Sequence, residues 1–244
     1  MDDIKPPRVP PYCRFKWYID VFITILTLPI LGPVLLLFMF LTWLTSKGPV
    51  IYTQIRCGKN GKPFKMYKIR SMYVDAEVRH GPVRPGEPDP RVTPIGRIMR
   101  RLHLDELTQL VNVWRGEMTV VGPRPARPEE IEVFKKEIPG YAYRMLVLPG
   151  LTGYAQLNHP ADWEVKGVRT KTIFDLEYIE RISFWFDMRI LLGTAFKFIR
   201  IKHPRLDNLP LRMLGVYRDP HESLWADIIG VEEFDDSTIV YNKN

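Results

Sequence analysis

Two adjacent carboxylates, Asp105 and Glu106, are the side chains in this sequence best suited to catalysis. They follow Arg100 by five and six residues, at the expected start of a helix. Adjacent helical residues project about 100° apart, so the two carboxylates would serve different tasks rather than share one proton. A carboxylate beside basic side chains stays ionised, which a nucleophile or a Mg²⁺ ligand requires. The alternative is structural, because Asp is a preferred helix N-cap and acids in a first turn complement the helix dipole.

A second candidate is Arg124, which stands between two prolines in the sequence Gly122-Pro-Arg-Pro125. A guanidinium held by a rigid turn suits bidentate phosphate binding, although a tight turn with a solvated arginine explains the same tetrapeptide. The stretch 58–61 lacks the Gly-Lys-Ser/Thr ending of a P-loop and indicates a hairpin turn. Metal-binding spacings are absent, and Cys13 and Cys57 are expected to be free thiols in or near a reducing cytosol.

The charge of the chain is concentrated in one segment. The 244 residues are 45% hydrophobic and carry a net charge of +7, which favours anionic partners. Between Gln54 and Arg101 stand twelve Lys or Arg side chains and four acids, a balance of +8. This basic segment either attracts anionic lipid headgroups or contains a phosphate site, and one does not exclude the other.

The apolar residues are concentrated in Val21–Ser46, where 26 consecutive residues carry no charge. As one helix this segment would be about 39 Å long, more than the roughly 30 Å of a bilayer's hydrocarbon. Pro29 predicts a kink near Leu28-Pro29, and basic residues flank both ends of the run. Because positive charge on both sides resists translocation of either flank, we expect a re-entrant helix rather than a spanning one. A buried core helix or a cleaved signal peptide fits the length of this run less well.

The remaining elements follow from hydrophobic periodicity and turn residues. A strand at Gly48–Gln54, a turn with Asn60-Gly61 and a return strand through Phe64–Met72 form a predicted hairpin. The other predicted elements are an irregular loop at 74–94, a helix from about Ile95 or Leu104 to Trp114, a strand before Gly122, a helix opening at Pro128, a turn-rich loop at Pro149–Gln156 and a helix at Phe174–Arg181.

The segment Ser183–Lys202 has the pattern of an amphipathic helix. One row contains Phe184 and Met188, and the neighbouring row contains Trp185, Leu192 and Phe196. This face fits either a core-facing helix or a helix lying in the membrane interface. The last 42 residues have four basic and eight acidic side chains and form an acidic tail.

Taken in order, the motifs resemble those of the bacterial sugar transferases, the monotopic polyprenyl-phosphate phosphoglycosyl transferases that initiate exopolysaccharide and O-antigen assembly. The similarity covers about residues 14–200 and rests on nine stretches. They are Gly48–Gln54, Gly58–Phe64, Tyr67–Met72, Asp89–Thr93 with Gly96, Arg100 with Leu104–Leu107, Gln109–Asn112, Gly116–Met118, Val121–Pro125 and Pro149–Gly153.

The resemblance implies transfer of a sugar 1-phosphate from a UDP-sugar to polyprenyl phosphate, with release of UMP. By position in the motifs, Asp105 matches the nucleophile that forms a covalent intermediate, and Glu106 matches its partner at Mg²⁺. Asp105 and Glu106 are thus the expected metal ligands. Arg100 and Arg124 match phosphate-binding arginines, and we add Arg70 of the Tyr67–Met72 motif to that set.

The implied fold is α+β: a re-entrant helix-break-helix at 14–47 and a mainly helical cytosolic catalytic domain at 48–202 with short strands and interfacial helices. An irregular segment, 1–13, precedes them, and the acidic tail, 203–244, lies outside the resemblance. The implied location is the bacterial inner membrane, with no nucleic-acid partner and with homo-oligomerisation left open.

Three departures and two competing functions accompany the resemblance. Leu28-Pro29 stands where the family usually has Ser-Pro, Thr108 stands where it usually has Pro, and Glu117 replaces the common Asp. A non-catalytic membrane-surface scaffold is one competing function, and it has no need of paired carboxylates with arginines. The second is a metal-dependent glycosyltransferase on a spanning helix, which would release UDP.

Overall fold

The computed structural model of the chain describes residues 4–74, 89–159, 164–199, 214–216 and 223–229. The described part is mostly helical with short strands, which confirms the α+β class. It divides into unit 1 (Met1–Trp17, Arg56–Phe64 and Glu117–Asn244) and unit 2 (Tyr18–Ile55 and Lys65–Gly116). In chain order the elements are η1 (Pro11–Arg14), α1 (Lys16–Thr45), β1 (Ile51–Cys57), η2 (Lys59–Gly61), β2 (Pro63–Ile69), α3 (Pro94–Arg101), η3 (Leu104–Gln109), α4 (Leu110–Trp114), β3 (Thr119–Val121), α5 (Pro128–Glu137), η4 (Tyr141–Leu146), β4 (Gly150–Thr152), α6 (Tyr154–Asn158), α7 (Val165–Arg181), α8 (Phe184–Ile199) and α10 (Leu224–Ile229).

Helix α1 contains nearly the whole uncharged run and has an inverted burial pattern. Among the described residues it is the single helix long and apolar enough to cross a membrane, and only 6% of its most apolar window is buried. Asp20, Thr24 and Thr42 are buried, whereas large apolar side chains such as Phe22 and Ile30 are exposed. Polar residues turned toward protein and apolar residues turned outward are typical of a helix that contacts lipid.

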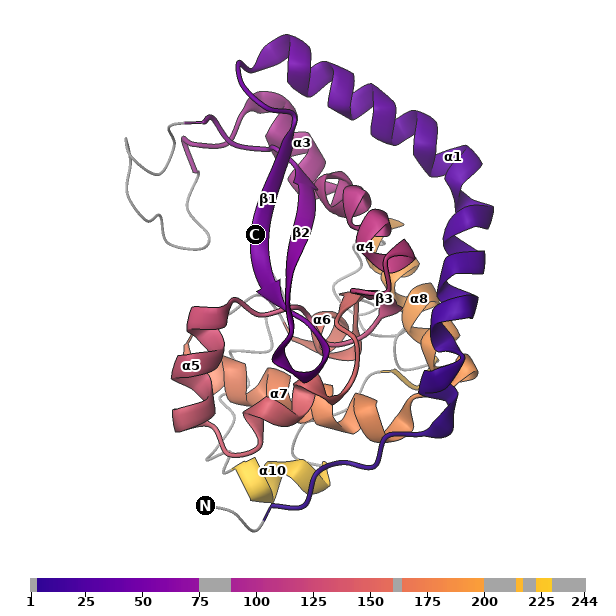
Figure 1. Cartoon of the computed structure of the whole chain (residues 1–244), viewed down its shortest axis with the longest axis vertical. Helices are drawn as coiled ribbons and strands as arrows, with labels where there is room; N and C mark the ends of the chain where they lie inside the picture. The colour runs from indigo at the N-terminus through magenta and orange to yellow at the C-terminus, as the bar shows by residue number, and fades with distance from the viewer. Residues whose placement is uncertain (1–3, 75–88, 160–163, 200–213, 217–222, 230–244) are drawn as a thin grey trace. The chain divides into compact units, whose positions relative to one another are not determined.

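The helix α1 is bent but not interrupted. It runs as one α-helix through Pro29 and Pro33, and Figure 1 shows the bend about midway along it. Each proline lacks the N–H that would complete a helical hydrogen bond. Just before them the Thr27 hydroxyl donates to the Ile23 carbonyl at 3.1 Å, a contact that also favours bending. A bend at this place agrees with the kink predicted near Leu28-Pro29.

The predicted hairpin is present as β1 and β2, which pair with each other. Its tip has Asn60 at φ 57° and Gly61 at φ +73°, both in the left-handed region that Asn and Gly tolerate best. The loop expected at 74–94 falls mostly on 75–88, outside the described residues. Its last part is ordered around an antiparallel bridge between Met72 and Val92.

Where a helix from about Ile95 or Leu104 to Trp114 was predicted, unit 2 has three shorter elements, α3, η3 and α4, and η3 with α4 covers Leu104–Trp114. The α3 helix stops because His103 adopts a left-handed backbone, with φ 50° and ψ 25°, at the N-cap of η3. The N-cap interpretation of Asp105 is therefore wrong, since Asp105 lies inside the first turn of a 3-10 helix. Met99 and Val113 are fully buried in the core of this unit.

Unit 1 is organised around a buried helix, α7. Ile173, Leu176 and Ile179 of α7 have no exposed surface, and the helix begins nine residues before the predicted Phe174. The short strands β3 and β4 pair in parallel, with Thr119 opposite Gly150 and Val121 opposite Thr152. The segment predicted as a turn-rich loop at Pro149–Gln156 thus contains β4 and the start of α6, while α5 begins at Pro128 as predicted.

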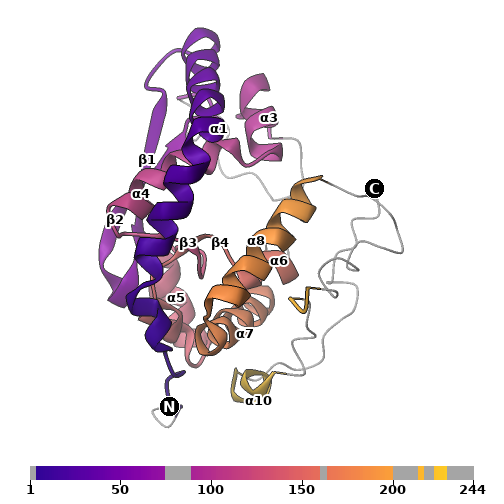
Figure 2. The same cartoon turned by 90° about the vertical axis from the view of Figure 1, so that its right-hand side faces the viewer.

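Helix α8, seen along its length in Figure 2, turns an unexpected side toward the core of unit 1. Phe186 and Ile190 are buried, while Trp185 and Leu192 of the predicted apolar face are 73% and 52% exposed. The core-facing interpretation of that face is wrong for these residues. In the tail, α10 packs against α7 and buries Trp225, and the other tail residues lie mostly outside the described part.

Candidate active site

Asp105 and Glu106 lie side by side on η3 in unit 2. Asp105 is 8% exposed, and its neighbour Glu106 accepts a hydrogen bond from Lys68 Nζ to Oε1 at 2.7 Å. Both members of this ion pair are largely buried, at 18% and 14% side-chain exposure. A 3-10 helix has three residues per turn, so the two carboxylates point about 120° apart. One carboxylate is thus held by a lysine, and the other has a separate direction available for chemistry.

The environment of Asp105 combines burial with positive charge. Burial raises the pKa of Asp105, and the Glu106 charge adds to this rise, whereas Lys68 and Arg100 act to lower it. Lys68 has the larger lowering effect of the two cations. An uncompensated buried carboxylate favours a further positive partner, because burial penalises the charged form. The site is therefore suited to take up a cation or a cation-bound phosphate.

Arg100 lies in the last turn of α3 and is held by a serine that follows β2. Its Nε donates to Ser71 Oγ at 2.9 Å, and its side chain is 41% exposed. The α3 helix lies close to this serine because Gly96 has no side chain. A Cβ on Gly96 would stand 2.0 Å from the Ser71 carbonyl oxygen. Arg100 is thus brought near Asp105 with much of its guanidinium open to solvent.

Arg70 has a different position from the one predicted. It is 6% exposed, and its guanidinium donates to the carbonyl oxygens of Ser46 at 2.7 Å, of Gly48 at 3.3 Å and of Lys47. These carbonyls follow the end of α1, where a cation complements the helix dipole. These contacts fasten the end of α1 and engage both terminal nitrogens of Arg70. A phosphate-binding role for Arg70 stays a prediction.

Arg124 lies in unit 1 on the loop between β3 and α5, and this loop is rigid as predicted. The Pro123 carbonyl accepts from the Gly150 N–H at 2.8 Å, and the Pro125 carbonyl accepts from Arg56 at 2.9 Å. The Arg124 carbonyl accepts from Arg144 Nη2 at 3.0 Å. Since each of these carbonyls is bonded, the loop presents the exposed Arg124 side chain from a fixed backbone.

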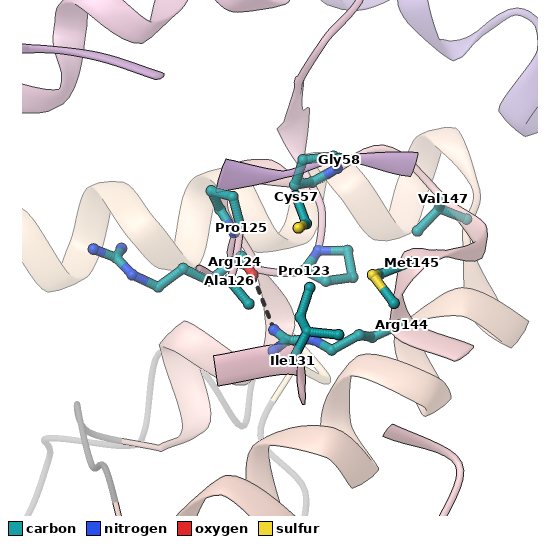
Figure 3. Close-up of a pocket in the computed structure, with 11 residues that line it drawn as sticks. Cys57, Gly58, Pro123, Arg124, Pro125, Ala126, Ile131, Arg144, Met145 and Val147 are labelled. Atoms are coloured by element: carbon teal, nitrogen blue, oxygen red, sulfur yellow. Dashed lines mark hydrogen bonds between the residues drawn. The ribbon is translucent and has the colours of Figure 1, made fainter. Parts of the chain in front are cut away.

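Close backbone packing explains the glycines of the two neighbouring motifs. A Cβ on Gly150 would lie 2.1 Å from the Gly122 nitrogen, and one on Gly153 would lie 2.2 Å from the Gly122 oxygen. Beside this loop is a small pocket, lined among others by Cys57, Pro123 and Arg144. In Figure 3 the Arg124 side chain extends away from the other lining residues.

The described residues contain no group of three or more His, Cys, Asp or Glu side chains arranged to hold a metal ion. Two carboxylates are nevertheless the protein contribution that Mg²⁺ commonly uses at phosphate-transfer sites, where water and substrate phosphates complete the octahedron. Asp105 and Glu106 fit that donor set, because both supply oxygen and Asp105 lacks full charge compensation.

Sequence reasoning did not single out Lys68 or Ser71. A signal for Lys68 exists in the period-two pattern of β2, where Phe64 and Met66 are buried and Lys68 falls on the same face. A lysine on the buried face of a strand requires a partner, and Glu106 is that partner. No comparable signal marks Ser71, since its contact with Arg100 spans 29 residues.

The chain is similar to proteins of known description over most of its length. Residues 12–201 match the family described as bacterial sugar transferase. A UDP-N-acetylgalactosamine-undecaprenyl-phosphate N-acetylgalactosaminephosphotransferase of Aeromonas hydrophila is 37% identical, over 76% of this chain and 44% of that protein. A UDP-glucose:undecaprenyl-phosphate glucose-1-phosphate transferase of Escherichia coli (strain K12) is 41% identical, over 73% of this chain and 39% of that protein.

A third relative is similar in length to the matched part. The exopolysaccharide production protein PSS of Rhizobium leguminosarum bv. phaseoli is 41% identical, over 72% of this chain and 90% of that protein. The chain spans less than half the length of the first two relatives. The family match covers well over half of the chain and contains every candidate residue. The chain therefore belongs to the bacterial sugar transferase family.

Proposed function

We propose that this chain transfers a sugar 1-phosphate from a UDP-sugar to a polyprenyl phosphate and thereby initiates assembly of a glycan or exopolysaccharide. The observation that carries the proposal is the buried Asp105 carboxylate beside Glu106, Lys68 and Arg100 on one unit. Relatives described as undecaprenyl-phosphate sugar-phosphate transferases support it.

The reaction proceeds in two displacements at one phosphorus atom. A carboxylate oxygen of Asp105 attacks the sugar-bearing phosphorus of the UDP-sugar, the bond from that phosphorus to the bridging oxygen breaks, and UMP leaves with the electron pair. A phosphate oxygen of the polyprenyl phosphate then attacks the same phosphorus. The bond to Asp105 breaks, which restores the carboxylate and yields polyprenyl-diphosphate-sugar. Such a covalent route divides one difficult transfer into two easier ones.

The protein's own side chains supply positioning and charge. Lys68 holds Glu106 in place, which leaves Asp105 free to attack. Arg100 binds phosphate oxygens whose charge grows in the transition state, and Arg124 keeps the phosphate-binding role that its motif implies. Asp105 and Glu106 would hold Mg²⁺, which neutralises diphosphate charge when bound.

The nucleotide product separates this proposal from the two competing functions. Membranes containing the chain are incubated with Mg²⁺, undecaprenyl phosphate and either UDP-glucose or UDP-N-acetylgalactosamine, and the released nucleotide is identified by chromatography. The proposal predicts UMP, and it predicts loss of UMP in Asp105→Asn. Release of UDP would favour the metal-dependent glycosyltransferase. No nucleotide with any UDP-sugar tested would favour the scaffold.

We further propose that α1 enters the cytoplasmic membrane and returns to the same face. Support comes from two contacts that lie near opposite ends of the uncharged run and involve the same unit. Trp114 Nε1 donates to Thr24 Oγ1 at 2.8 Å, and Thr42 Oγ1 lies 4.0 Å from Met99 Sδ. A helix that crosses the bilayer would carry these two threonines toward opposite faces, because 18 residues span about 27 Å.

Labelling of single cysteines tests this topology. In a variant without native cysteines, one cysteine is placed near the N-terminus and another near residue 60, and each is treated with a membrane-impermeant maleimide in spheroplasts. Both sites should be protected until the membrane is permeabilised, since the proposed location of the catalytic part is the cytosolic face. Labels on opposite faces would refute the re-entrant arrangement. The exposed Trp185 and Leu192 of α8 fit a helix that lies in a membrane interface.

A further inference from the structure

Arg100 carries a phosphate-binding role in the proposed function, and the structure contains a second cation beside it whose role is not explained by that function. Arg91 forms a fork with Asp89: its Nε donates to Oδ1 at 2.8 Å and its Nη2 donates to Oδ2 at 2.9 Å. The Arg91 backbone N–H also donates to Asp89 Oδ1, at 3.0 Å. Both oxygens of Asp89 are therefore engaged by one arginine.

The same carboxylate stands at the edge of ion-pair distance from Arg100. Asp89 Oδ2 lies 4.0 Å from Arg100 Nη1, beyond hydrogen-bond distance. The pKa of Asp89 is lowered, most of all by its hydrogen bond from Arg91, while the charge of Arg100 has the smallest effect. Asp89 is therefore paired with Arg91, although Arg100 lies at the limit of ion-pair distance.

The opposite side of the Arg100 guanidinium is held by Ser71. Besides the bond from Nε to Ser71 Oγ, the Ser71 carbonyl accepts from the Thr93 N–H at 3.0 Å. Thr93 in turn caps α3 by accepting from the Gly96 N–H at 2.9 Å. One serine therefore fixes both the beginning of α3 and the arginine at its end, which determines the direction of the guanidinium.

From these contacts we propose that Ser71 and Arg91 are positioning residues that keep the terminal nitrogens of Arg100 available for substrate phosphate. Ser71 orients the guanidinium through Nε. Arg91 occupies the Asp89 carboxylate, which would otherwise close on Arg100 and compete with the phosphate. This inference rests on the proposed function of Arg100. It gives a role to the Asp89-Arg91 pair, and neither residue takes part in the proposed reaction.

The first test removes the Arg91 side chain and then neutralises Asp89 by changing it to asparagine, which keeps the turn between Asp89 and residue 91. In Arg91→Ala the freed Asp89 should pair with Arg100 and raise the KM for the UDP-sugar. Since a partly exposed ion pair is worth up to about fivefold in an equilibrium, the expected rise in KM is about three- to fivefold. Adding Asp89→Asn should return KM to within about twofold of the wild type. Asparagine keeps the Oδ1 acceptor for the Arg91 N–H but has no charge.

A second series tests Ser71 against a merely structural role. Ser71→Ala should raise KM, while Ser71→Thr, which keeps the hydroxyl, should remain closer to wild type. Both Ser71→Ala and Arg91→Ala should have no further effect in an Arg100→Ala background, because each acts through Arg100. Thermal unfolding of every variant identifies any that fail to fold.

The dissociation constant of UDP with Mg²⁺ is measured in parallel on the same purified full-length variants. If no UDP-sugar yields UMP, the proposed function fails, while the UDP series still tests the positioning roles. The inference is overturned if Arg91→Ala leaves both the KM for the UDP-sugar and the dissociation constant of UDP unchanged. It is equally overturned if Asp89→Asn does not restore them, or if the effects persist without Arg100.

Discussion

Replacement of Asn112 by alanine should lower the free energy of unfolding of unit 2 by more than the worth of one hydrogen bond, because the Asn112 side chain makes two. Asn112 has no exposed surface, its Nδ2 donates to the Lys65 carbonyl at 2.7 Å, and its Oδ1 accepts from the Tyr67 N–H at 3.3 Å. One side chain of α4 thus pairs with the backbone of β2 as a neighbouring strand would. This contact also holds the strand that carries Lys68, the partner of Glu106.

The expected magnitude follows from these contacts. Two hydrogen bonds are worth about 1 kcal/mol each, and the small cavity left by the amide adds about 1 kcal/mol. A loss of about 2–3 kcal/mol corresponds to a fall in Tm of about 5–10 °C for a chain of this length. Asn112→Asp should be at least as damaging, because it places a carboxylate oxygen against the Lys65 carbonyl.

Thermal unfolding in a fixed detergent, followed by intrinsic fluorescence, measures this effect. Val111→Ala is the matched control, since Val111 precedes Asn112 on α4 and is 36% exposed. The control should change Tm by no more than about 2 °C. An Asn112→Ala variant with the same Tm as Val111→Ala would refute the stabilising role of this contact. An Asn112→Asp variant as stable as wild type would refute it as well.

Three further predictions rest on single contacts. Gly96→Ala should fold poorly, with a loss above about 3 kcal/mol in thermal unfolding, because its Cβ would meet the Ser71 oxygen at 2.0 Å. Arg70→Gln should loosen the end of α1, seen as faster hydrogen exchange at 46–48, while Arg70→Lys should retain part of the protection. In Cys13→Ala, alkylation of Cys57 should have its pH midpoint above that of a free cysteine peptide, because burial raises the pKa of this thiol. A midpoint at or below the peptide's would contradict the third prediction, and unchanged exchange would contradict the second.

The sequence predicted those elements whose conformation depends on residues adjacent in the chain. The Asn60-Gly61 turn, the bend at the prolines of α1 and the rigid loop around Arg124 each follow from the conformational limits of the residues present. The paired carboxylates were likewise visible as adjacent letters in the sequence.

Contacts between distant segments were not predictable in this way. In the sequence Arg70 is one of several cations in a basic segment. In the structure its guanidinium donates to backbone carbonyls just after α1, 22 to 24 residues earlier. Gly150–Thr152 reads as a turn, yet pairing with β3 makes it a strand. The left-handed backbone of His103, which separates α3 from η3, is uncommon for a residue other than glycine, and the sequence did not predict it.

The central claim is that Asp105 becomes covalently bonded to the sugar-bearing phosphate. Intact-protein mass spectrometry tests it after the chain is mixed with Mg²⁺ and a UDP-sugar in the absence of polyprenyl phosphate. We expect an adduct with the mass of one sugar phosphate, mapped by proteolysis to the peptide that contains Asp105, absent from Asp105→Asn and discharged when undecaprenyl phosphate is added. Release of UMP with no adduct on rapid quenching, or an adduct on another residue, would contradict the claim.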